Sequence, residues 1–287
     1  MKAAHRSACA LLAVVWLATT LAMLAVAGSP AMASGPVLTH VSYGSSAEEF
    51  MRIYPAKAAG STTVILVHGG GWRLQSGMNT ASGIGNEANS IREHHATVFD
   101  IEYPQDTNST AFPLETHAVE AATAFAKAHA AEYNANPAKV VLVGGSAGGQ
   151  LVERVAEAIK PAGVVALSGP TDFVSLTEAV RNGTYKEAKF ITSLGKALGC
   201  EPRTGPCPES YEREWSPVDN IPAANCPPWL LFSAQEDLIP VSQDREMQTA
   251  LEAAGCSSTL DVIPGKGHAF SYWSSVKLTI FNFIASV

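Results

Sequence analysis

The sequence predicts an α/β protein in which a mostly parallel sheet carries helices on both faces. Two observations indicate this class. Short runs rich in β-branched residues alternate with segments of helical periodicity along most of the chain, which is typical of parallel strands joined by crossover helices. Several runs, such as "TTVILV" from Thr62 to Val67, are apolar almost throughout, as strands buried on both faces tend to be.

The expected elements follow in a simple order. Residues 37–44 and 48–56 predict an opening antiparallel pair, and residues 62–70 and 96–104 predict two buried strands. The elements predicted after these are a helix over 114–137, a strand over 139–144, a helix over 147–159, strands over 163–169 and 228–234, a helix over 241–255, a strand over 259–264 and a closing helix from about Tyr272.

Residues 171–225 interrupt this alternation. They hold many Gly and Pro residues, with only short helical pieces between them. An insertion after about the sixth strand is where we expect a cap over a functional site. A surface excursion pinned by cysteines is the alternative.

The first 33 residues differ from the rest of the chain. Lys2 and Arg6 precede an uncharged apolar run over 8–27, and "AMA" at 31–33 places small residues where a signal peptidase cleaves. We therefore expect a signal peptide over 1–33, an extracellular protein and a single domain over 34–287 with 171–225 as its insertion. A retained membrane anchor is the alternative, since the run is long enough to span a bilayer.

The charge excludes two classes of partner. The formal charge is −7, and it becomes −9 without Lys2 and Arg6. No run of Lys and Arg remains after residue 33, which argues against binding to nucleic acid or to an anionic membrane.

Four cysteines remain after residue 33, and an even number in an exported protein suggests two disulfides. Three pairings are possible. We favour Cys200–Cys207, which would close a loop rich in Pro and Gly, together with Cys226–Cys256. A zinc site is not expected, because there is no CxxC pair and no histidine near a cysteine in sequence. No metal and no cofactor is predicted.

Polar side chains follow several of the predicted strands. His68 follows the apolar run "TTVILV" over 62–67, Ser146 the strand over 139–144, Glu236 and Asp237 the strand over 228–234, and His268 the last strand. Because ligands bind at the carboxyl ends of parallel strands, these side chains are expected on one rim of the sheet. A serine, a carboxylate and a histidine would then meet there, in that chain order.

The stretch "GGSAGG" from Gly144 to Gly149 contains the pattern G-x-S-x-G. In this pattern a serine occupies a sharp turn between strand and helix, and small residues are needed two positions before and after it. The turn places the hydroxyl at a helix N-terminus, where backbone N–H groups stabilise negative charge. A tight turn of purely structural use is the alternative.

With these motifs the sequence resembles the α/β-hydrolase fold and, within it, the HGGG-bearing esterase and lipase group. The matching stretches are "HGGGW" at 68–72, "GGSAGG" at 144–149, "EDLIPV" at 236–241 and "GKGHAF" at 265–270. The opening "VSYG" followed by "EEFMRIYP" is similar to the acetyl-esterase and feruloyl-esterase-like branch. The resemblance covers most of residues 34–287 and is weakest over 171–225.

The resemblance assigns a catalytic triad. It implies Ser146 as nucleophile, His268 as the base that takes and returns the proton, and Asp237 as the carboxylate that holds the imidazole. Glu236 is the rival acid, and the family spacing before "IPV" favours Asp237.

The resemblance also assigns an oxyanion hole, formed by the backbone N–H groups of Gly70, Gly71 and Ala147. His68 is expected to be a structural hydrogen-bonding residue that shapes the glycine loop. Trp72 is expected either beside the pocket or in the core.

The leading hypothesis is a secreted serine carboxylic-ester hydrolase that acts on small acyl or aryl esters, with a small-molecule or polysaccharide-linked ester as substrate. An amide hydrolase, either an aryl formamidase or an exopeptidase, is the first alternative, because the HGGGW form also occurs in kynurenine formamidases. A hydrolase-fold binding protein without catalysis is the second.

Overall fold

The computed structural model describes residues 35–72, 81–105, 111–222 and 224–287. The expected signal segment over 1–33 lies outside the described residues. In the described part of the chain, no helix is both long enough and apolar enough to cross a membrane.

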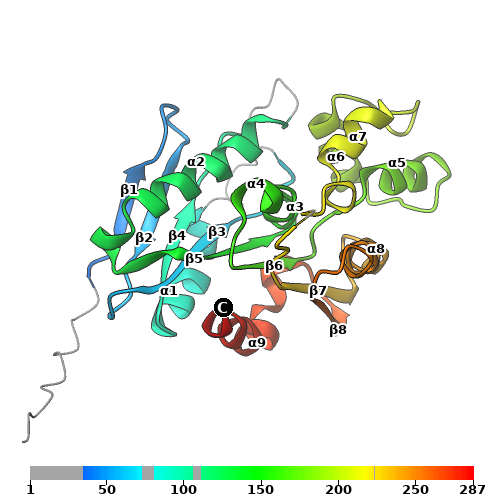
Figure 1. Cartoon of the computed structure of the whole chain (residues 1–287). Coiled ribbons are helices and arrows are strands. Elements are labelled where there is room, and N and C mark those ends of the chain that lie inside the picture. The colour runs from blue at the N-terminus through cyan, green and yellow to red at the C-terminus, as the bar shows by residue number, and fades with distance from the viewer. Residues whose placement is uncertain (1–34, 73–80, 106–110, 223) are drawn as a thin grey trace, which may run out of the picture. The chain divides into compact units, whose positions relative to one another are not determined.

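Eight strands of the described residues form one sheet in the order β1-β2-β4-β3-β5-β6-β7-β8 (Figure 1). β1 pairs with β2 and β2 with β4 in antiparallel fashion, and all other neighbours are parallel. The predicted fold class is confirmed. The strands are β1 (Leu38–Ser42), β2 (Phe50–Tyr54), β3 (Ser61–Val67), β4 (Ala96–Ile101), β5 (Ala135–Gly145), β6 (Gly163–Leu167), β7 (Trp229–Glu236) and β8 (Ser258–Lys266).

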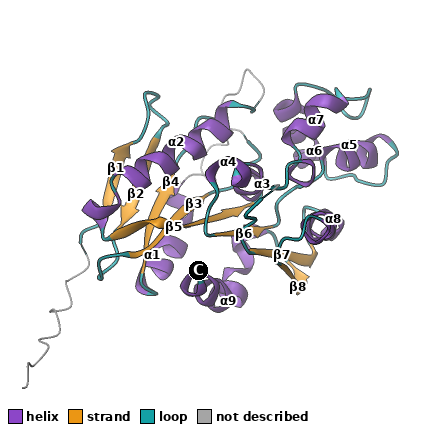
Figure 2. Cartoon of the chain, viewed as in Figure 1, coloured by secondary structure: helices purple, strands orange, loops and turns teal. Residues whose placement is uncertain are grey.

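Helices cover the sheet on both faces (Figure 2). α1 (Gly85–Glu93) and α9 (Trp273–Ser286) pack on one face. α2 (Leu114–Ala128), α3 (Ala147–Arg154), α4 (Ala156–Ile159) and α8 (Val241–Ala253) pack on the other. Central strands such as β4 and β6 are buried at every position because both of their faces are covered.

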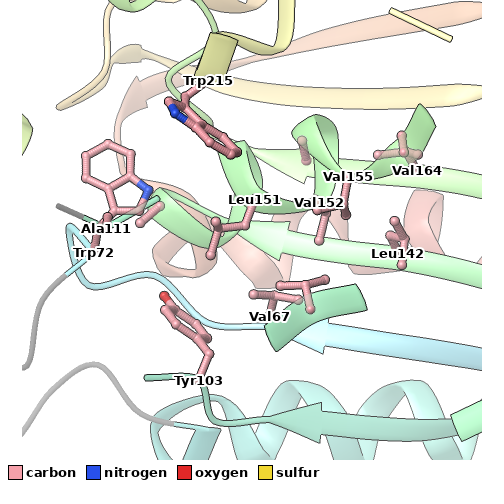
Figure 3. Close-up of a cluster of buried hydrophobic side chains, with 14 of the residues drawn as sticks. Val67, Trp72, Tyr103, Ala111, Leu142, Leu151, Val152, Val155, Val164 and Trp215 are labelled. Atoms are coloured by element: carbon pink, nitrogen blue, oxygen red, sulfur yellow. The ribbon is translucent and has the colours of Figure 1, made fainter. Parts of the chain in front are cut away.

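The larger of the two cores lies on the α3 side of the sheet. Figure 3 shows Trp72 and Trp215 near Leu151 of α3, with Val67 and Leu142 reaching up from the sheet. Burying a large apolar side chain completely stabilises the fold by about 1.5–3 kcal/mol. This core therefore fixes α3, and with it the turn that precedes α3.

The segment over 171–225 contains three helices: α5 (Phe173–Arg181), α6 (Ala188–Leu198) and α7 (Glu209–Trp215), followed by the 3-10 turn η3 (Pro217–Asp219). Asp172 caps α5 by accepting a hydrogen bond from the Ser175 backbone N–H. A disulfide joins Cys200, just after α6, to Cys207, just before α7, and a second joins Cys226 to Cys256. These are the two pairs that the sequence favours.

Two predicted helices need correction, and one helix of the structure was not predicted. The helix expected over 114–137 is wrong beyond Ala128: a 3-10 turn, η2 (Ala130–Tyr133), follows, and Asn134 then takes a left-handed φ of 61° that ends the helical path. Residues 135–136 already belong to β5 and pair with β3. The helix expected over 147–159 is divided at Val155 into α3 and α4, and α1 had no counterpart in the prediction.

Candidate active site

Three loops at the carboxyl ends of the parallel strands carry the predicted site residues. Ser146 directly follows β5, Asp237 directly follows β7, and His268 lies two residues after β8 and just before the 3-10 turn η4 (Ala269–Tyr272). The order of the sheet places β6 between β5 and β7, with β8 beyond β7. Residues distant in sequence therefore converge on one rim.

Ser146 occupies a sharp turn between β5 and α3. Its φ is 56° and its ψ is −125°, a conformation that residues with a side chain rarely adopt. A Cβ on Gly144 would lie 2.2 Å from the Gly148 carbonyl oxygen, and a Cβ on Gly148 would lie 2.3 Å from the Val67 carbonyl oxygen. The turn therefore requires glycine on both sides of the serine, as the motif predicts.

The three predicted side chains meet in a hydrogen-bonded row. His268 Nε2 lies 2.9 Å from Ser146 Oγ, and His268 Nδ1 lies 2.6 Å from Asp237 Oδ1. The Asp237 side chain is fully buried, whereas the His268 side chain is 27% exposed. The hydrogen-bonded row thus begins at a carboxylate that is shielded from solvent and ends at a hydroxyl that a ligand can reach.

The Asp237 carboxylate accepts hydrogen bonds on both oxygens. Oδ2 accepts from Ser168 Oγ at 2.6 Å and from the Ala234 backbone N–H at 3.0 Å, and Oδ1 accepts from the Ile239 backbone N–H at 3.1 Å. Burial raises the pKa of the Asp237 carboxyl, but hydrogen bonds from His268 and Ser168 lower it more, so its pKa lies below the usual value. The group is therefore ionised near neutral pH.

Glu236, the rival acid, is the last residue of β7. Its side chain is exposed, and it stands beside Lys266 of β8 in the strand register. It is the carboxylate of Asp237 that meets the His268 imidazole.

The glycine loop after β3 lies against the serine. Gly70 and Gly71 take positive φ angles of 138° and 65°, which favour glycine. His68 is buried, donates from Nδ1 to the Gly69 carbonyl at 2.6 Å, and places Nε2 3.1 Å from Glu102 Oε1. His68 thus shapes the loop, as expected. Ala147 is the first residue of α3. The backbone N–H groups in the first turn of a helix have no acceptor within the helix and point out of its N-terminal end.

Trp72 ends the described part of this loop and is buried in the core. Its indole N–H donates to Gln150 Oε1 at 2.9 Å, and its ring packs against Phe190 of α6. The core alternative for Trp72 is the one that the structure supports.

A cavity of about 470 Å³ opens over the serine. It is lined by the glycine loop, by Ser146 and His268, and by Lys189, Phe190 and Ser193 of α6. A neighbouring cavity of about 530 Å³ shares His268 and is bordered by Glu187, Glu236 and Lys266. α6 thus forms one wall of the space in front of the serine. No group of three or more potential metal ligands occurs among the described residues.

A family model named BD-FAE matches residues 51–251, which is more than half of the chain and includes Ser146 and Asp237. The chain belongs to the BD-FAE family. The expected membership of an α/β-hydrolase esterase group is thereby confirmed, and with it the classification as a carboxylesterase-type hydrolase. No curated protein sequence matched this BD-FAE family member.

Solved structures with the same fold include several enzymes named as esterases. A carbohydrate esterase from gut microbiota has a TM-score of 0.72 at 20% identity, over 88% of this chain and 96% of its own. Esterase B from Lactobacillus rhamnosis has a TM-score of 0.69 at 18% identity, over 88% and 87%. An acetyl ester-xyloside bifunctional hydrolase from Caldicellulosiruptor lactoaceticus has a TM-score of 0.69 at 14% identity, over 90% and 98%. At these identities the similarity establishes the fold of this BD-FAE family member.

Sequence reasoning missed three contributors to the site of this BD-FAE family member. Ser168 and Glu102 each directly follow a strand, β6 and β4, but the predicted strands over 163–169 and 96–104 extended past them, so the strand-end criterion did not select them. The residues of α6 that line the cavity show no such pattern in the sequence, because only tertiary packing brings this helix to the cavity.

Proposed function

We propose that the protein is a secreted serine carboxylic-ester hydrolase acting on small acyl or aryl esters. The observation that carries the proposal is the row formed by Ser146 Oγ, the His268 imidazole and the Asp237 carboxylate, with separations of 2.9 and 2.6 Å. A hydroxyl becomes a useful nucleophile when a base can remove its proton, and the base is oriented by a third group. This arrangement meets both conditions.

In the proposed acylation step, Ser146 Oγ attacks the ester carbonyl carbon while its proton passes to His268 Nε2. Asp237 accepts the Nδ1–H hydrogen bond and stabilises the imidazolium that forms. The electrons of the carbonyl double bond move to its oxygen. We propose that the backbone N–H groups of Gly70, Gly71 and Ala147 stabilise this oxyanion. Gly70 and Gly71 line the same cavity as Ser146, and Ala147 begins the helix that directly follows Ser146.

The intermediate then expels the alcohol, which takes the proton from His268 Nε2 and leaves an acyl ester on Ser146. A water molecule repeats the sequence: His268 takes its proton, the hydroxide oxygen bonds to the acyl carbon, and Ser146 Oγ departs with that proton. The products are a carboxylic acid and an alcohol, and the enzyme is regenerated.

The cavity and the family support the proposed substrate range. A volume of about 470 Å³ with Phe190 and Leu238 in its lining suits a small acyl or aryl group. Neighbours of the same fold are named as a carbohydrate esterase and as an acetyl ester-xyloside hydrolase, which supports an ester carried on a polysaccharide. The two disulfides support the proposed export, since such bonds persist in oxidising compartments.

Hydrolysis of p-nitrophenyl acetate tests the proposal. We expect Ser146→Ala to abolish measurable turnover and Asp237→Asn to lower kcat by about 10⁴-fold, because the imidazole loses its orienting carboxylate. Glu236→Gln is the matched control: it neutralises the adjacent, exposed carboxylate and should leave kcat within about two-fold. Undiminished turnover by Ser146→Ala would refute the proposed nucleophile.

A substrate comparison defines the bond and the chain length. Esters from acetate to laurate, tested beside N-formyl and aminoacyl amides at equal concentration, should give turnover that collapses beyond butyrate and is low on both amides. Sustained laurate hydrolysis would indicate a lipase, and preference for the N-formyl substrate would indicate a formamidase.

A further inference from the structure

Ser168 lies at the centre of the rim, between the strands that carry the nucleophile and the acid. It directly follows β6, and its side chain is fully buried. Its backbone N–H donates to the Phe232 carbonyl of β7 at 2.7 Å, and the carbonyl of the preceding Leu167 accepts from the Ser146 backbone N–H at 2.8 Å. The turn at Ser168 is thus tied to both neighbouring loops.

The Ser168 hydroxyl has three partners: Asp237 Oδ2 at 2.6 Å, the Ala269 backbone N–H at 2.9 Å and the Tyr272 hydroxyl at 2.7 Å. The ionised Asp237 can only accept, so Ser168 Oγ–H donates to it. The Ala269 N–H can only donate. Because Ser168 donates its single proton to Asp237, the contact with Tyr272 needs the Tyr272 proton, which the Phe232 carbonyl at 3.1 Å also accepts, so these two acceptors share it. The Ser168 hydroxyl thus donates to Asp237 and accepts from the Ala269 N–H.

These bonds connect the acid to the segment that carries the base. Ala269 immediately follows His268, and Tyr272 ends the same short turn, η4. Both Ser168 and Ala269 hold left-handed φ angles, 54° and 49°, where glycine would be less strained. Residues with side chains persist in such conformations where surrounding contacts hold them, and these often lie at functional sites.

We propose that Ser168 is a positioning residue of the triad, whose hydroxyl fixes the Asp237 carboxylate relative to the backbone that carries His268. The inference rests on the proposed function, because it concerns the same reaction. Ser168 is not itself a lining residue of the cavity, and its hydroxyl bonds Asp237 and the His268 segment rather than the Ser146 hydroxyl, so it acts through those two. It also donates to the buried carboxylate, which favours the ionised form of Asp237.

The test compares Ser168→Ala with wild type on p-nitrophenyl acetate over pH 4–9. We expect kcat to fall by about 10- to 100-fold, as for loss of a hydrogen bond to a buried charge, with KM within about two-fold. The acid limb of the kcat profile should move to higher pH at its low-pH end, because Asp237 loses a donor, its pKa rises, and the protonated carboxyl no longer stabilises the His268 imidazolium. Titratable groups that interact with this carboxylate are His268, Asp244, Tyr185 and Tyr272, and Glu187, Glu236 and Lys266 border the same cavity as Asp237.

Ser216→Ala is the matched control. Ser216 is also a fully buried serine whose hydroxyl donates one bond, to the Glu212 carbonyl, and accepts one, from the Phe173 N–H, but it lies away from the triad. It should lower the melting temperature and leave the acid limb in place. If Ser168→Ala does not fold, Ser168→Gly removes the same hydroxyl and suits the φ of 54°.

The outcomes separate this inference from the proposed function. If folded Ser168→Ala keeps the wild-type kcat and acid limb while Ser146→Ala is inactive, only the role of Ser168 is overturned. Equal loss of kcat in Ser168→Ala and Ser216→Ala without a shift of the acid limb would also overturn it. Activity retained in Ser146→Ala would instead overturn the proposed function.

Discussion

At the scale of single residues, the site depends on backbone conformations and close approaches that few residues tolerate. Ser146 has a left-handed φ of 56°, and the glycines around it leave no room for a Cβ. The sequence revealed this turn because its glycines are a local pattern. It did not reveal Ser168, whose hydrogen bonds join residues about 70 and 100 positions apart.

Gly148→Ala tests the close approach at the turn. The added Cβ would lie 2.3 and 2.4 Å from the backbone oxygens of Val67 and His68, which cannot move without disturbing β3 and the glycine loop. We expect the free energy of unfolding to fall by about 1–3 kcal/mol or more, as in other overpacked sites, and kcat to fall with it. Urea unfolding and p-nitrophenyl acetate turnover measure the two effects.

Gly205→Ala is the control for this substitution. A Cβ there meets nothing within 4 Å, so its free energy of unfolding should stay within about 0.5 kcal/mol of wild type. A Gly148→Ala variant as stable as Gly205→Ala would show that the turn can relax.

At the scale of elements, the sheet order brings the loops together, and the segment over 171–225 supplies a wall of the cavity. α6 places Phe190 against Trp72 on one side and in the cavity lining on the other. Pairs of cysteines close two loops in this half of the chain: Cys200–Cys207 spans 7 residues, and Cys226–Cys256 spans 30, linking the approach to β7 with the end of α8. Their contributions to stability should differ with loop length.

Paired serine substitutions test this difference. In the chain-entropy model, closing a loop of 30 residues stabilises by about 3.5 kcal/mol and a loop of 7 residues by about 2.5 kcal/mol. We therefore expect the variant with Cys226→Ser and Cys256→Ser to be the less stable of the two double variants in urea unfolding. The reverse order would mean that native contacts, rather than loop entropy, dominate.

At the scale of the whole molecule, the core contains carboxyl groups whose charged form is disfavoured by burial. Both oxygens of Glu115 and of Glu153 lack a hydrogen-bond partner within the described residues. Burial raises the pKa of each of these groups well above its usual value, and nearby Asp244 adds to the effect at Glu153. In the unfolded chain these groups lose their protons near their ordinary pKa. Above that pH, the folded state therefore binds more protons than the unfolded state.

This difference predicts how stability depends on pH. The contribution of Glu153 to the free energy of unfolding is fully present below the ordinary glutamate pKa. As the pH rises from there toward the folded-state pKa, this contribution is lost, and the free energy of unfolding falls by up to about 1.4 kcal/mol per pH unit. Glu153→Gln should flatten the decline in the free energy of unfolding between pH 5 and 8 and stabilise the protein at pH 8. Urea unfolding at three pH values measures the slope, with exposed Glu252→Gln as a control that should retain it. An unchanged slope in Glu153→Gln would contradict the prediction.

The sequence by itself determined the fold class, the turn at Ser146 and the chain order of serine, acid and histidine, because each depends on local patterns of periodicity, glycine and strand ends. The choice of Asp237 over Glu236 came from the resemblance to the family, and the contact between Asp237 and His268 agrees with it. Only the tertiary structure decided that Ser168 joins Asp237 to the segment of His268 and that α6 walls the cavity. Both depend on contacts between segments distant in the chain, which local sequence patterns do not record.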